Sequence, residues 1–191
     1  MKATELLTKQ MTMVHNRIAG LANLTGEEWL ARPAPGENRV GFTAWHMVAT
    51  RDWVVRGILG GERPLGWDAP FAGTSIALCP IPLGMPGSEA DAIAEAVSPA
   101  EVVAYSAAVT AELTRWLASA DQDALDAPPS DGHAHLALSP RYNDRPFRFE
   151  VLEDPDDMCQ WPVWQLLSRP AYVHCIGHLA EIDLARRALV R

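Results

Sequence analysis

An apolar stripe near the N-terminus constrains the fold of this chain more than any other feature. Between residues 3 and 24, apolar side chains recur at alternating spacings of four and three: Leu7, Met11, Val14, Ile18 and Leu21. This period places them on one face of an α-helix, and that face has to be buried against other elements. The stripe therefore predicts a helix over residues 3–24 that packs within a helical domain.

Three further segments have helical patterns of similar length. They cover residues 41–59, residues 98–119 and the chain after Pro170. The clearest start signal is Ser98, which can cap a helix, with Pro99 in the first helical position. Glu101 completes a capping box. Together with the first segment, these patterns predict four core helices.

Two long connections separate these helices, residues 60–97 and residues 120–169, and the first is rich in Gly and Pro. A short amphipathic helix is predicted over residues 88–97. An alternating run over residues 147–152 has the period of a strand, so a small β-hairpin is a possible addition to the helices. We predict an all-α four-helix bundle with long crossing loops and an antiparallel core, forming one domain over residues 1–191. Such long loops either cover a site or decorate the surface.

Charge and composition exclude several classes of protein. The net charge is −8 over 191 residues, which argues against nucleic-acid binding and against binding to an anionic membrane surface. No apolar run approaches the length of a transmembrane helix, and no signal peptide is recognisable after Lys2. Three widely spaced cysteines suit neither a disulfide framework nor a zinc knuckle. We therefore expect a cytoplasmic protein with free thiols.

The histidines are the candidate metal ligands. His174 and His178 are four residues apart, so they share one face of the last helix, and Ile182 continues that face towards the core. Two core histidines with ordinary hydrogen bonds would give the same pattern. A metal site needs a third ligand, because two imidazoles bind weakly and unspecifically.

His46 is the best candidate for the third ligand, because it lies in a strongly apolar stretch of the second helix. His15, His133 and His135 are poorer candidates, since the first lies at the edge of its helix's stripe and the other two lie in a loop. If the second and fourth helices face each other, the imidazoles of His46 and His178 should lie within about 8 Å.

Two segments resemble the DinB-like family. Residues 37–52, ENRVGFTAWHMVATRD, are similar to the family pattern N-S-I-G-x-x-x-W-H-x-x-x-x-x-D, whose histidine is a metal ligand. Residues 174–184, HCIGHLAEIDL, resemble the pattern H-x-x-x-H-R-G-Q-I-D-x-L, with Leu-Ala-Glu in place of R-G-Q. The resemblance implies a four-helix bundle with one divalent metal ion on His46, His174 and His178.

The resemblance also implies two reaction types. Imidazole ligands suit Zn, Ni and Fe, so the ion is expected to be one of these. Such an ion converts bound water or a bound low-molecular-weight thiol into a nucleophile. The protein would then be a hydrolase, or a thiol transferase or isomerase, acting on a small-molecule substrate. The contrasting class is a non-catalytic bundle that binds a metal or a partner, and a homodimer is left open.

Three other residues lie near the expected site. Glu181, three residues after His178, is a candidate general base or a partner of a ligand histidine, unless it is simply a solvated carboxylate. Asp52 follows His46 by six residues, about 600° around the helix, and should anchor the helix rather than bind metal. Cys175 is rotated by about 100° from His174 and should point away from the site.

Overall fold

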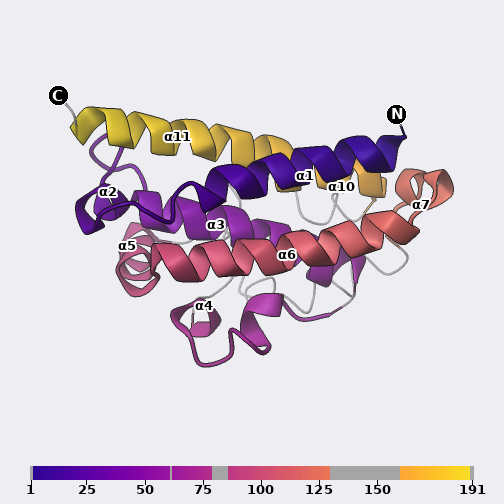
Figure 1. Ribbon diagram of the computed structural model, residues 1–191, viewed down its shortest axis with the longest axis horizontal. Helices are drawn as coiled ribbons and strands as arrows, with labels where there is room; N and C mark the ends of the chain where they lie inside the picture. Colours follow the sequence, from indigo (N-terminus) through magenta and orange to yellow (C-terminus); the bar gives the residue numbers. More distant parts are fainter. Residues whose placement is uncertain (1, 61, 79–85, 130–159, 190–191) are drawn as a thin grey trace.

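The computed structural model describes residues 2–60, 62–78, 86–129 and 160–189. Over these residues the chain forms helices and no strand, which confirms the predicted all-α class. The four long helices are α1 Ala3–Ala19, α3 Val40–Asp52, α6 Pro99–Ser119 and α11 His174–Leu189 (Figure 1). The strand-like run at residues 147–152 lies outside the described residues.

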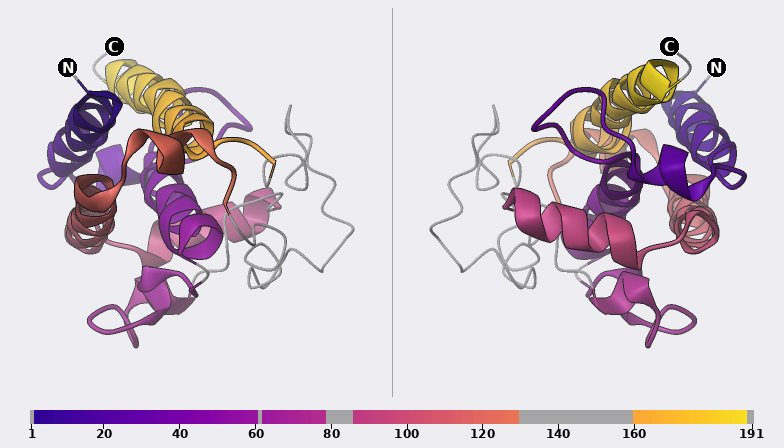
Figure 2. Two further views of the ribbon diagram at one scale, coloured as in Figure 1. Left: turned by 90° about the vertical axis from the view of Figure 1, so that its right-hand side faces the viewer. Right: turned by 90° about the vertical axis from the view of Figure 1, so that its left-hand side faces the viewer.

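The four long helices pack as a bundle, seen end-on in Figure 2. Helix α1 packs against α6, and α3 packs against α11. Both of these pairs are antiparallel, whereas α1 and α11 run in the same direction, as do α3 and α6 (Figure 1). The core is therefore not antiparallel throughout. The physical reason is the long connection after α3, which returns the chain to the end of the bundle where α3 began.

Shorter helices lie between the long ones. They are α2 Gly26–Leu30, α4 Ser75–Leu78, α5 Gly87–Ala96, α7 Gln122–Asp126, α10 Val163–Ser168 and the 3₁₀ turn η2 Leu65–Trp67. Helix α5 confirms the short helix predicted over residues 88–97 to within one residue at each end. The capping box is also confirmed: the Ser98 hydroxyl accepts the Glu101 N–H, and the Glu101 carboxylate accepts the Ser98 N–H at 2.9 Å.

Two of the helices continue through wider π-helical turns. Helix α3 runs on as η1, Trp53–Leu59, and α10 runs through η3, Arg169–Val173, directly into α11. The last helix was predicted to follow Pro170, but helical structure already begins at Val163. Proline normally interrupts an α-helix because it lacks an N–H and its ring crowds a preceding carbonyl. Here the chain stays helical because the turn containing Pro170 widens to the π form.

The predicted stripe is buried as expected, with Leu7, Met11, Val14, Ile18 and Leu21 no more than 5% exposed. However, α1 ends at Ala19 instead of residue 24, so Leu21 is buried from the turn that follows the helix. Helix α3 lies at the centre of the bundle, and every residue from Val40 to Asp52 is buried. A side chain on any face of α3 therefore meets a neighbouring element. No single helix in the described ranges has the length and apolar composition of a membrane span. Helices α5 and α6 have this length and composition only when taken together, and they are bent by 95° relative to each other.

Asp52 ties α3 to its neighbours, as predicted. Its carboxylate accepts hydrogen bonds from the Tyr105 hydroxyl on α6 and from the Gly66 N–H at 3.0 Å. Burial raises the pKa of this carboxyl above its usual range. A Cβ on Gly66 would lie about 3 Å from Ile76 and Tyr105, so only glycine lets the η2 turn approach this closely.

Gly41 at the start of α3 is expected to tolerate no side chain. An added Cβ would lie 2.5 Å from Nε1 of Trp29, which donates a hydrogen bond to the Val97 carbonyl at 2.9 Å. We expect Gly41→Ala to lower the free energy of unfolding by about 1–3 kcal/mol, measured by urea denaturation. Gly26→Ala is the matched control, because a Cβ there meets nothing within 4 Å. An equal loss in both variants would contradict the packing argument.

Candidate metal centre

Three histidines from two core helices converge on one point. His46 comes from α3, and His174 and His178 come from the first two turns of α11. Each offers one nitrogen, and these three atoms lie within 4.8 Å of one another. The ring centroids of His46 and His178 are 4.9 Å apart, which confirms the predicted approach of the second and fourth helices.

The local sequence explains how the imidazoles are held. The spacing of four residues brings the His174 and His178 rings together on α11, with centroids 4.4 Å apart. Phe42 lies one turn before His46 on α3, and its ring stacks on the His46 ring at 5.6 Å with 18° between the planes. This stacking fixes the orientation of His46 inside the bundle.

The hydrogen bonding of His178 defines which of its two ring nitrogens is available to bind a metal ion. Its Nδ1 lies 2.7 Å from a carboxylate oxygen of Glu181, so Nδ1 carries the hydrogen and donates a hydrogen bond to that oxygen. Its Nε2 is buried and has no hydrogen-bond partner among the described residues. A buried acceptor without a donor is costly in a folded protein. A metal ion bound to Nε2 would satisfy it.

The electrostatics also suit a cation. Burial, with a smaller contribution from neighbouring His178, lowers the pKa of His174 to about 4. His174 is therefore neutral near pH 7, and neutral imidazole is the form that binds metal. Two nitrogens bound to one tetrahedral ion at roughly 2.0–2.1 Å lie about 3.3 Å apart. The Nε2 atoms of His46 and His174 are already 2.9 Å apart, so the residues present fit one ion.

Among the described residues, the other thiol and imidazole groups lie apart from this cluster. Cys175 is fully buried, its Sγ donates to the Met47 carbonyl at 3.8 Å, and burial raises the pKa of its thiol to about 12. It points away from the cluster, as predicted. His15 contacts the Ser106 hydroxyl of α6 at 3.1 Å. His133 and His135 lie outside the described residues.

Arg51, one residue before Asp52, is a feature that sequence reasoning missed. Its side chain is fully buried, and it donates hydrogen bonds to the Thr110 hydroxyl at 3.1 Å and to the Met11 carbonyl at 3.4 Å. Burial lowers the pKa of its guanidinium. An arginine near the end of a helix is normally expected to be exposed. Here the packing of neighbouring elements on every side of α3 buries it.

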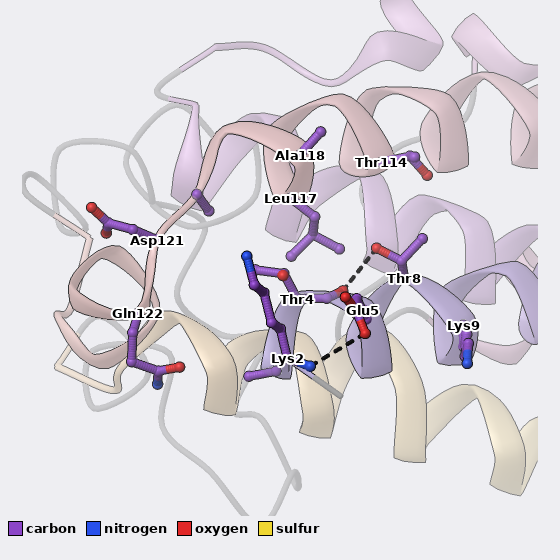
Figure 3. Close-up of a pocket in the computed structure, with 12 residues that line it drawn as sticks. Lys2, Thr4, Glu5, Thr8, Lys9, Thr114, Leu117, Ala118, Asp121 and Gln122 are labelled. Carbon is purple, nitrogen blue, oxygen red and sulfur yellow. Dashed lines mark hydrogen bonds between the residues drawn. The ribbon is translucent and has the colours of Figure 1, made fainter.

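A groove of about 920 Å³ lies between the start of α1 and the end of α6 (Figure 3). It is lined by Leu117, by small apolar side chains and by polar ones such as Lys2, Glu5 and Gln122. None of the three clustered histidines lines it. The groove therefore has no direct part in the chemistry of the cluster.

The fold and the cluster define a helical-bundle protein with a candidate three-histidine metal centre. The sequence profile of the DinB superfamily matches residues 9–152, and the chain belongs to that superfamily. The matched residues include His46, whereas His174 and His178 lie beyond them. No curated protein matches the sequence.

Proposed function

We propose that this protein is a metal-dependent enzyme whose single divalent ion activates water or a low-molecular-weight thiol. The observation that carries the proposal is the convergence of His46, His174 and His178 within 4.8 Å. In addition, the buried Nε2 of His178 has no hydrogen-bond partner among the described residues. Membership of the DinB superfamily supports it. The substrate is a small molecule, and Zn, Ni and Fe are the candidate ions.

The three histidines have the task of holding the ion without neutralising it. Imidazole is uncharged, so a set of three leaves the full positive charge to act on the next ligand. A bound ion of this kind lowers the pKa of water or of a thiol by several units. Burial keeps the His174 imidazole neutral and so ready to bind. Three ligands also leave a coordination position open, which is typical of catalytic rather than structural sites.

Glu181 has the task of orienting His178 in this proposal. Its carboxylate accepts a hydrogen bond from the Nδ1–H of His178, which directs the Nε2 lone pair of that ring towards the cluster. Its side chain is 45% exposed, so it also has access to solvent. As a general base it would instead have to release His178 and reach the bound nucleophile. These two roles differ in their effect on metal affinity.

Glu181→Gln is expected to weaken metal binding about 10–100-fold, measured by competition with a chelator. Asp183→Asn is the control, because Asp183 on the same helix pairs with Arg17 of α1 at the surface. If Glu181→Gln binds metal as tightly as the native protein but shifts or flattens the pH profile of activity, Glu181 is the general base.

The open coordination position can be tested in protein whose native metal has been replaced by cobalt(II). Adding 2-mercaptoethanol is expected to produce a new absorption band from sulfur–cobalt coordination, and adding azide to change the visible cobalt bands. The fit of both titrations gives dissociation constants. A spectrum unchanged by either ligand would show that no position is open. It would favour the second candidate, a non-catalytic metal-binding bundle.

A further inference from the structure

Gly177 lies between the two histidines of α11, and packing among the described residues does not account for it. Glycine weakens the interior of a helix relative to alanine. At Gly41 and Gly57 a Cβ would press on Trp29 and Trp53 at 2.5 and 3.2 Å, which explains those helical glycines. A Cβ on Gly177 meets nothing within 4 Å. No contact among the described residues therefore requires a glycine at this position.

Gly177 lies on the solvent side of the histidine pair. Val173, the last residue of η3, is followed at spacings of four by Gly177 and Glu181 of α11, so the three form a second row beside the histidines. Val173 is 60% exposed, Gly177 is exposed, and the Glu181 side chain is 45% exposed. Cys175, on the other flank of the histidines, is fully buried. Gly177 thus leaves a gap in this exposed row, because it has no side chain between the apolar Val173 and the acidic Glu181.

We propose that the ligand of the metal centre reaches the ion across the bare backbone at Gly177, with its apolar part against Val173. This inference rests on the proposed function and adds the direction of approach. The ligand class that fits is a small molecule with a metal-binding sulfur or oxygen atom on a slim, largely apolar arm. A side chain at position 177 would fill the space of that arm.

Two substitutions separate access from folding. Gly177→Leu places a leucine side chain at the proposed crossing, and Ala188→Leu places the same side chain on exposed α11 surface 11 residues further on, about 16 Å along the helix. Both variants and the native protein are loaded with cobalt(II) and titrated with azide and with benzyl mercaptan. Azide is a narrow probe, and benzyl mercaptan carries an apolar arm.

We expect every variant to bind one cobalt per chain and azide with affinities within about threefold. Gly177→Leu should weaken benzyl mercaptan binding at least tenfold, and Ala188→Leu should not. In the metal-free protein, Gly177→Ala should raise Tm by about 2 °C, because alanine favours the helix and its Cβ meets nothing.

Two results would overturn the inference alone. One is unchanged binding of benzyl mercaptan by Gly177→Leu while the native protein binds it. The other is a fall in Tm for Gly177→Ala, which would mean that protein packs over this glycine. If the native cobalt protein binds neither azide nor thiol, the proposed function fails, and this inference fails with it.

Discussion

Alanine in place of His178 is expected to abolish stoichiometric metal binding, and His46→Ala and His174→Ala should do the same. Each substitution leaves two imidazoles, which hold a divalent ion only weakly. We expect the affinity to fall by more than about 100-fold, since loss of a mere hydrogen-bonding partner of a ligand already costs 10–100-fold. Elemental analysis of protein purified without a histidine tag measures the metal content per chain.

Two other histidines provide the controls for this experiment. His15→Ala should keep the metal, because His15 contacts Ser106 between α1 and α6 rather than the cluster. His133→Ala should also keep it. If His133→Ala loses the metal while His46→Ala retains it, then His46 is not the third ligand, and the site must be rebuilt around His133.

The metal-free protein is expected to lose stability as the pH falls from about 6.5 to about 4. His174 has a folded-state pKa of about 4, lowered from 6.5 by burial and by His178. Between these values the unfolded chain binds a proton that the folded protein excludes, so acid favours unfolding. Because His174 keeps some contact with solvent, we expect this histidine to contribute about 2 kcal/mol rather than the full value of the shift.

Urea denaturation of the metal-free protein at several pH values measures this effect. Carboxylates also titrate in the range, so the comparison is with His174→Gln, which cannot take up a proton at this position. The variant should lose less stability than the native protein between pH 6.5 and 4. Parallel curves for the two proteins would show that His174 does not carry the pH dependence.

Local patterns in the sequence correctly predicted the parts of the fold that depend on residues three or four apart. The stripe from Leu7 to Ile18, the capping box at Ser98 and the histidine pair on α11 each follow from the geometry of a single helix. The continuation of the last helix through Pro170 was not predictable in this way. A π turn there depends on how α10 and α11 pack against the bundle, whereas proline by itself signals an end.

The sequence by itself determined the candidates for the metal centre, because an i, i+4 pair of histidines shares a helix face whatever the fold. Only the tertiary structure decided that His46, 128 residues before His174, meets that pair with 2.9 Å between the two Nε2 atoms. The tertiary structure also shows that Glu181 accepts a hydrogen bond from the Nδ1–H of His178. The physical reason is that the packing of α3 against α11 sets which faces meet, and this packing depends on the whole core rather than on either helix.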